Sequence, residues 1–408
     1  PVSVLEKHSI VGGIARTESY KGFSFDMGGH RFFSKSSAVN AFWDKILTDR
    51  FLSRPRQSRI YYRRKFFDYP LRALNAFRNL GILESCLIIF SCLRWKAFPY
   101  KEEKTFEQWV VNRFGKRLFK TFFESYTEKV WGISCSELSA DWAAQRIKGL
   151  SLKTAVLTAL GKKDRGIKTL IESFKYPEKG PGMMWEEVAS QIVAMGGIVK
   201  VEAEVRRIYR TGNVIKNIET VDPRTKATER FSGTEFISSM PVSELVLKMD
   251  PIAPENVRRA AEKLCYRDFL TVCLIVNDEQ IFSDNWIYIH DANVKVGRIQ
   301  NYKNWSPKMV PDKTKSSLGL EYFCNQGDSL WSMSDDDLVD LAKREIQNLG
   351  LIESDKVVDG CVFRVEKSYP VYDSSYRDHL ATLREFVDGF SNLQTIGRNG
   401  LHRYNNQD

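Results

Sequence analysis

Two pairs of glycines, each followed by an arginine, have the residue types and spacing that suit phosphate chemistry. These residues are Gly12, Gly13 and Arg16, and Gly28, Gly29 and Arg31. Paired glycines let backbone N–H groups approach a bulky anion, because no Cβ stands in the way and positive φ is accessible. A neighbouring guanidinium adds a permanently charged fork for a diphosphate. The pattern predicts a phosphate-binding segment, with a glycine-rich structural hairpin as the alternative.

Just before this segment, residues 2–5 predict a short buried strand that ends at Glu6. A carboxylate at the tip of a strand, beside glycines, is the group that a Rossmann-type site uses to hold ribose hydroxyls. The G-x-G-x-x-G turn that precedes such a strand is not in this sequence. We expect the first strand, phosphate turn and helix to be missing from it. A structural role for Glu6 is the alternative.

The stretches EKHSIVGGIART and FDMGGHRFF resemble the second and third FAD-contacting motifs of one flavoprotein superfamily. This superfamily includes amine oxidases, protoporphyrinogen oxidases and UDP-galactopyranose mutases. The resemblance implies FAD as cofactor, held by Glu6, Gly12, Gly13, Arg16, Gly28, Gly29 and His30. It also implies an α/β fold, with a Rossmann-like FAD-binding domain interleaved with an α+β substrate domain of a helical bundle and an antiparallel sheet. The FAD-binding domain takes residues 1–53, 181–263 and 331–408, and the substrate domain takes residues 54–180 and 264–330.

Composition narrows the class of protein. The 408 residues carry a net charge of +10, but basic and acidic residues are interleaved, so nucleic-acid binding is not expected. A basic field equally suits an anionic small substrate. The seven dispersed cysteines form no metal-ligand spacing and favour reduced thiols in the cytoplasm. The apolar run 82–98 has too short an uncharged part, residues 85–93, to span a bilayer. A buried or interfacial helix is expected there, which leaves peripheral membrane contact and oligomer formation open.

Local patterns place the main elements. Ser36 or Ser37 caps a helix to Leu47, Thr105 with Gln108 forms a capping box, and Ser334 caps a further helix. The other predicted helices are 183–195, 335–350 and 378–386, within or beside a helical region at 71–131. The predicted strands are a hairpin pair turning at 63–65, then 198–208, 213–221, 231–238, 269–276, 286–290, 317–323, 357–365 and 393–396, with residues 305–307 in a loop, a proline turn at 369–372 and a basic linker at 161–166.

The end of the helical region carries polar-tipped aromatics suited to a ring-shaped ligand. Residues 122–131 are similar to a mutase segment whose Tyr-Thr-x-Lys-x-Trp contacts uridine and phosphate. The resemblance therefore assigns Tyr126, Lys129 and Trp131 to the substrate. Residues 66–71, which contain Tyr69, look like the mutase segment that leads into the substrate domain. A packed helix face and a solvated basic turn are the structural alternatives.

Near the C-terminal end, a strand runs into Gly397, Arg398 and Gly400, which again suits a cofactor phosphate or flavin ring. The mutases carry a similar succession in which an arginine and two tyrosines hold the substrate, and these correspond to Arg398, Tyr369 and Tyr404. The resemblance also places Val205 near adenine and suggests Arg364 as a second diphosphate-binding arginine. The chain departs from the mutase pattern at His402 and at Asn406-Gln407.

Three functions remain open from the sequence. The first is ring contraction of a nucleotide sugar with reduced FAD for cell-surface polysaccharide synthesis, as the mutase resemblance implies. The second is an FAD-dependent oxidoreductase of the protoporphyrinogen or amine oxidase type. The third is a flavin-binding fragment without turnover. Cationic side chains around the pocket favour the mutase, whereas a dry aromatic pocket favours the oxidase.

Overall fold

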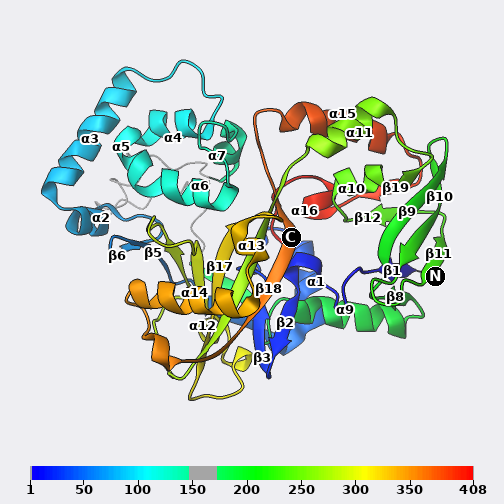
Figure 1. The fold of residues 1–408 in the computed structure, drawn as a ribbon, viewed down its shortest axis with the longest axis horizontal. Helices are drawn as coiled ribbons and strands as arrows, with labels where there is room; N and C mark the ends of the chain where they lie inside the picture. The colour runs from blue at the N-terminus through cyan, green and yellow to red at the C-terminus, as the bar shows by residue number, and fades with distance from the viewer. Residues whose placement is uncertain (1, 147–171, 408) are drawn as a thin grey trace.

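The computed structural model describes residues 2–146 and 172–407, in which a helical lobe and a mixed α/β lobe flank a central sheet (Figure 1). The predicted α/β class is confirmed. The helical lobe confirms the helical region expected from residue 71 onward. Its elements are α2 (Ala73–Leu80), α3 (Ile82–Ala97), α4 (Phe106–Phe114), α5 (Lys116–Phe119), the π-helical turn η3 (Lys120–Glu124), α6 (Ser125–Trp131) and α7 (Ala140–Arg146).

The central sheet has seven strands in the order β18-β14-β17-β16-β15-β5-β6. Their bounds are β5 (Ser58–Tyr62), β6 (Lys65–Asp68), β14 (Tyr266–Val276), β15 (Trp286–Ile289), β16 (Arg298–Asn301), β17 (Ser316–Cys324) and β18 (Val357–Pro370). The antiparallel sheet expected within residues 264–330 is confirmed, since β14, β17, β16 and β15 pair antiparallel, and β5 joins this sheet parallel to β15. These two strands come from distant parts of the chain, so no tight turn constrains their direction.

Alternation along the strands gives this sheet two different faces, since successive side chains point to opposite sides. On one face, Leu270, Val272, Leu320 and Ile299 pack in one apolar cluster with α14 (Asp335–Asn348). We call this side the α14 face. The opposite side, which we call the loop face, carries Thr271, Trp286, Tyr288, Arg298, Gln300, Glu321 and Tyr369.

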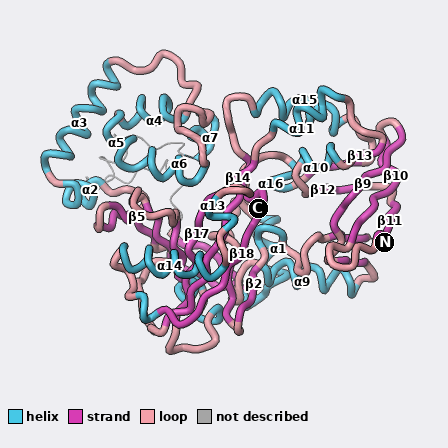
Figure 2. Tube along the Cα trace, in the orientation of Figure 1, coloured by secondary structure: helices cyan, strands magenta, loops and turns pink. Residues whose placement is uncertain are grey.

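The mixed α/β lobe is built from small sheets and helices (Figure 2). Its strands include the parallel pairs β1 with β8 and β12 with β19, and a four-stranded sheet in the order β11-β10-β9-β13. The strand bounds are β1 (Ser3–Leu5), β8 (Ile198–Lys200), β9 (Glu204–Thr211), β10 (Val214–Val221), β11 (Thr228–Ser232), β12 (Phe236–Ser238), β13 (Met249–Asp250) and β19 (Leu393–Thr395). The helices are α9 (Gly182–Ala194), α10 (Val242–Leu247), α11 (Glu255–Lys263), α15 (Tyr376–Asp388) and the turn α16 (Gly397–Gly400).

Several predicted elements in this lobe need correction. The single strand expected at 198–208 is two strands, because β8 pairs with β1 whereas β9 pairs with β10. The strand expected at 231–238 is likewise divided between β11 and β12. The strand at residues 2–5 is not buried, since Val2 is 62% exposed and, of the strands in the described ranges, β8 alone pairs with β1. Strand β18 continues through Tyr369 to Pro370, where a turn was expected, and Trp305 ends a short helix, α12 (Tyr302–Trp305).

The local signals for caps and hairpins are confirmed. Ser36 caps α1 (Ser37–Leu47), Thr105 and Gln108 form the capping box of α4, and Ser334 caps α14. The β5–β6 hairpin turns at Arg63 and Arg64 as expected. The basic linker predicted at 161–166 lies outside the described residues.

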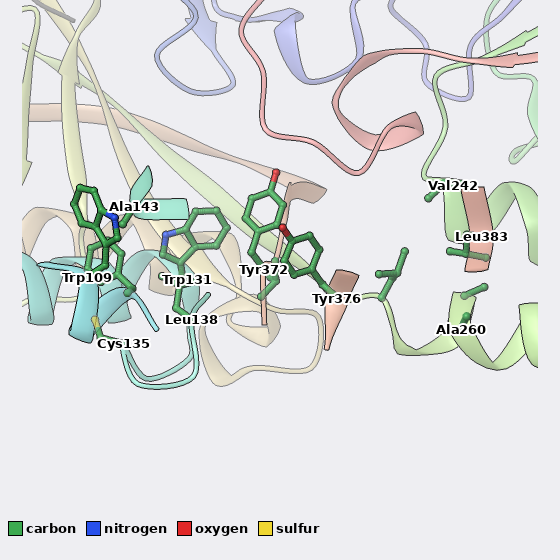
Figure 3. Packing of buried hydrophobic residues seen from close by; sticks show 14 of the residues in the cluster. Trp109, Trp131, Cys135, Leu138, Ala143, Val242, Ala260, Tyr372, Tyr376 and Leu383 are labelled. Carbon is green, nitrogen blue, oxygen red and sulfur yellow. The ribbon is translucent and has the colours of Figure 1, made fainter. Parts of the chain in front are cut away.

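One apolar cluster joins the helical lobe to the mixed lobe (Figure 3). Trp131 and Leu138 contribute from the helical side, and Val242 and Leu383 from the other side. Tyr372 and Tyr376 lie between them, with ring centroids 4.8 Å apart. Because this core is continuous, the segment after β18 is held in place from both lobes.

Candidate active site

The hairpin formed by β2 (Thr17–Tyr20) and β3 (Phe23–Asp26) brings the two glycine pairs together. Thr17 is paired with Asp26, so Gly12-Gly13 and Gly28-Gly29 leave the hairpin at the same end. Gly12, Gly13 and Gly28 all have positive φ. The predicted loop conformation is therefore present in both pairs, and the hairpin brings them to one end although residues 14–27 separate them in the sequence.

At the first glycine pair, the guanidinium of Arg16 is held locally. Its Nε donates to Glu18 at 2.6 Å and its Nη1 donates to the Gly13 carbonyl at 3.1 Å. Glu6 lies at the end of β1, as expected, and its carboxylate accepts the backbone N–H of His8 at 2.9 Å. The neighbouring Lys7 contacts Glu366 on β18 at 3.5 Å, which connects this end of the site to the central sheet.

At the second glycine pair, the chain lies against the loop face of the sheet. A Cβ on Gly29 would lie 3.5 Å from Nη1 of Arg298, and a Cβ on Gly28 would lie 3.1 Å from Nε2 of His30. The C-terminal segment reaches the same place, because Nε2 of Gln407 donates to the His30 carbonyl at 3.0 Å. Residues near both ends of the chain therefore meet at this place.

Arg398 lies between the tyrosines expected to accompany it. Its guanidinium carbon is 5.3 Å from the Tyr369 ring centre and 4.5 Å from that of Tyr404, and the two rings stack. Nη1 and Nη2 donate to the carbonyls of Ser368 and Asn405 at 3.0 and 2.9 Å. Burial raises the pKa of Tyr369 to about 12, so its hydroxyl stays protonated. Gly397 and Gly400 form the short turn that holds Arg398.

His30 is neutral in this setting. Burial and, to a smaller extent, the charges of Arg398 and Arg298 together lower its pKa to about 3, against the opposing effect of a hydrogen bond with Met27. Nε2 lies 2.8 Å from the Met27 carbonyl oxygen, which only accepts, so Nε2 carries the proton. Nδ1 is therefore the acceptor atom that His30 offers.

A second cationic group lies over the loop face beyond His30. Arg31 and Arg56 stack on Trp286 at 5.2 and 5.7 Å, and Arg56 also stacks on Tyr69 at 5.1 Å. The Tyr69 ring lies 4.9 Å from that of Tyr288. Burial lowers the pKa of Arg31, and the charge of Arg56 lowers it further. Within residues 2–146 and 172–407, neither arginine forms an ion pair with a carboxylate.

Two predicted substrate residues have other partners. Arg364 points to the α14 face, where it contacts Asp335 at 2.6 Å and the carbonyls of Trp331 and Met333. Nζ of Lys129 donates to the carbonyls of Asp291, Val294 and Val296 at 2.9–3.0 Å and to that of Ile289 at 3.4 Å. Both cations are thus engaged by the protein, which departs from the expected contact with phosphate.

The remaining predicted residues are divided. Tyr126 stacks on His290 at 4.5 Å and meets Tyr288 edge-on at 5.7 Å, so it borders the cationic group. Trp131 is buried and contacts Tyr369 at 6.1 Å. Val205 lies on β9, and its carbonyl accepts Nζ of Lys248 at 2.7 Å, which leaves less of its backbone for an adenine than expected.

Sequence reasoning did not assign Arg56, Tyr288 and Arg298 to the site. The arginine-rich stretch from residue 54 to 71 was the available signal, but a solvated basic turn explains such a stretch equally well. Arg298 forms a buried ion pair with Glu321 at 2.5 Å, and Gln300 donates to the same carboxylate. These residues become neighbours only through the pairing of β5, β15, β16 and β17.

Two glycine turns, a hairpin and a C-terminal arginine converging on one sheet define a dinucleotide-binding protein of the flavoprotein type. The chain belongs to the family of flavin containing amine oxidoreductases, whose model matches residues 1–397. The cofactor of this family is FAD.

Solved structures with the same fold are similar to this chain at low sequence identity. A reduced UDP-galactopyranose mutase has a TM-score of 0.83 at 19% identity, over 98% of this chain and 83% of its own. A protoporphyrinogen oxidase homologue from Exiguobacterium sp. 255-15 has a TM-score of 0.72 at 16% identity, over 97% and 88%. A putrescine oxidase variant has a TM-score of 0.61 at 14% identity, over 96% and 86%.

The residues present fit FAD. A Cβ on Gly13 would meet no atom within 4 Å, so the backbone there is open to a large group. Nε1 of Trp185, beside Gly12, and Nε of Arg398 are buried and have no hydrogen-bond partner in the described part of the chain. Spare buried donors at both ends of the site suit an anionic dinucleotide. No cluster of metal ligands occurs among the described residues.

Proposed function

We propose that this protein is an FAD-dependent enzyme that acts on an anionic, diphosphate-bearing substrate. The observation that carries this proposal is the pairing of Arg31 with Arg56 over the loop face without a carboxylate. Two partly buried guanidinium groups without a carboxylate partner among the described residues are costly, and a bound diphosphate would reduce that cost. Bound FAD supplies a ring that takes up or returns an electron pair.

A nucleotide sugar is the substrate that we infer, with ring contraction as in UDP-galactopyranose mutase. Arg31 and Arg56 bind the diphosphate, and Arg398 neutralises charge that develops beside Tyr369 and Tyr404. Neutral His30 orients the flavin face through its Nδ1 acceptor. A role in cell-surface polysaccharide synthesis in the cytoplasm follows from that substrate.

An oxidoreductase of the amine or protoporphyrinogen oxidase type is the second candidate function. The aromatic wall of Trp131, Tyr369 and Tyr404 favours it, because such a wall excludes water from a hydride donor. Under this alternative, the arginines would bind a carboxylate-bearing substrate.

A paired assay separates the two functions. The FAD-loaded full chain should convert UDP-galactopyranose only after reduction, and Arg398→Ala, compared with the wild type at equal amounts of bound FAD measured by flavin absorbance, should abolish conversion. Amine-dependent release of peroxide, with no ring contraction of any nucleotide sugar, would establish the oxidase function instead.

A further inference from the structure

The outer side of the helical lobe carries an apolar surface that the proposed catalytic function does not use. Eight large apolar side chains of α2, α3 and the residue after α3 are 46–76% exposed. They include Leu74, Phe77, Leu83, Phe90, Leu93 and Phe98. We call this surface the α2–α3 face. Figure 1 shows α3 along the outer edge of the lobe, away from the central sheet.

Helix α3 is apolar on both sides. Ser85, Ile88 and Cys92 form its buried stripe, and Cys92 packs tightly against Gly115. Leu83 and Phe90, seven residues apart, lie on the opposite side, where a water-facing helix normally carries charges. A helix with two apolar sides needs cover on both, and the described residues cover one.

The charges around this surface identify its occupant. Arg63, Arg64, Arg78, Arg94 and Lys96 are exposed at its borders. Between residues 63 and 98 the acidic residues are Asp68 and Glu84, and these contact Arg72 and Arg117. A second copy of the chain would bring like charges together, whereas anionic lipid headgroups would complement them.

We propose that the α2–α3 face binds the surface of an anionic lipid bilayer. Helix α3 lies in the interface plane, with Leu83 and Phe90 among the acyl chains and Arg94 and Lys96 at the headgroups. Among the described residues no helix has the length and apolarity needed to cross a membrane. The site described above lies elsewhere, on the loop face of the sheet.

Vesicle sedimentation tests the proposal with the FAD-loaded full chain. Vesicles of phosphatidylcholine mixed with phosphatidylglycerol should bind the protein, and vesicles of phosphatidylcholine alone should bind it far more weakly. Leu83→Glu and Phe90→Glu should each lower the partition coefficient about tenfold or more. Val193→Glu is the matched control, because Val193 is an exposed apolar residue on α9 at 56% and should bind like the wild type.

A double variant tests whether Arg94 and Lys96 contribute to binding through their charge. Arg94→Gln together with Lys96→Gln should weaken binding to the anionic vesicles by roughly fivefold per residue, and added salt should reduce the difference. Equal binding to both kinds of vesicle would contradict the proposed role of anionic headgroups. No binding to anionic vesicles, or a dimer that Phe90→Glu converts to a monomer, would overturn the proposal.

Spin labels locate the contact independently of affinity. Cys86 is exposed on α3, and Cys265 is exposed between α11 and β14, outside the helical lobe. A label on Cys86 in a Cys265→Ser protein should become protected from an aqueous relaxation agent when vesicles are added. A label on Cys265 in a Cys86→Ser protein should stay accessible, and protection of both labels alike would contradict a docking face confined to α2–α3.

Discussion

The two faces of the central sheet use their polar side chains in opposite ways. On the α14 face, Arg364 has a carboxylate and two carbonyls as partners, and Glu345 accepts the N–H groups of Lys295 and Val296. On the loop face, Arg31 and Arg56 contact aromatic rings and have no carboxylate partner among the described residues. A saturated guanidinium fixes the scaffold, whereas one with spare donors is available for an anionic ligand.

Arg298 is an exception to this difference between the two faces. It lies on the loop face, yet its guanidinium is bound by the buried carboxylate of Glu321. It therefore belongs to the scaffold of the site, and it positions the segment of Gly29 that rests against it.

The largest effect is expected from Glu321→Ala. This change leaves the charge of Arg298 buried without a partner, which costs about 3–5 kcal/mol of unfolding free energy. Urea denaturation measures the loss. The double variant Glu321→Met with Arg298→Met should recover most of it, because it removes both charges. A loss below about 1 kcal/mol for Glu321→Ala would show that the pair contributes little.

A smaller effect, on binding and not on folding, is expected from Arg56→Ala. Loss of a charge-assisted hydrogen bond to phosphate should weaken UDP binding about ten- to a hundredfold by titration calorimetry, with FAD still bound. Arg364→Ala is the matched control from the α14 face and should leave UDP affinity unchanged.

Lys129→Met adds a second control to this comparison. In the wild type, backbone carbonyls hold the Lys129 ammonium. The Met variant should therefore lose stability and keep its affinity for UDP. Weaker UDP binding by Lys129→Met or Arg364→Ala, at the level of Arg56→Ala, would contradict the distinction between saturated and spare donors.

The smallest effect concerns pH. The pKa of folded His30 is about 3, below the ordinary value of 6.5, so the unfolded chain takes up a proton first as the pH falls. The stability that neutral His30 contributes at neutral pH is therefore lost progressively as the pH falls below 6.5. His30 is only partly buried, and we expect it to account for about 1 kcal/mol of that loss between pH 7 and pH 5.

His30→Gln should reduce the difference between the melting temperatures at pH 7 and pH 5, because glutamine does not titrate. His290 and His402 also have lowered pKa values and are present in both proteins, so their contributions cancel in the comparison. An unchanged difference would mean that His30 is not held neutral by its surroundings.

Elements governed by neighbours in sequence were predictable. The cap at Ser36, the capping box of Thr105 and Gln108 and the β5–β6 hairpin depend on side chains within a few residues of the backbone groups they satisfy. The strand at 198–208 was predicted as one because its alternation continues across 201–203, where the chain changes from one sheet to another.

The site residues that could be predicted from the residue pattern are the glycine pairs and the arginines that follow each pair within three residues. The resemblance to the mutases implied that Lys129 and Arg364 contact the substrate phosphates, but a cation serves a ligand or the scaffold according to what faces it. Lys129 meets the carbonyls of the segment after β15, and Arg364 meets Asp335, and neither neighbour follows from spacing.

The sequence by itself determined the two glycine pairs, their arginines and the elements around them, because backbone conformation and capping are decided over short distances along the chain. Which charged side chains remain available for a ligand depends on the tertiary structure. The partner of a guanidinium comes from whichever strand or helix packs against it, and the pairing of β5 with β15 and of β16 with β17 joins residues distant in the sequence.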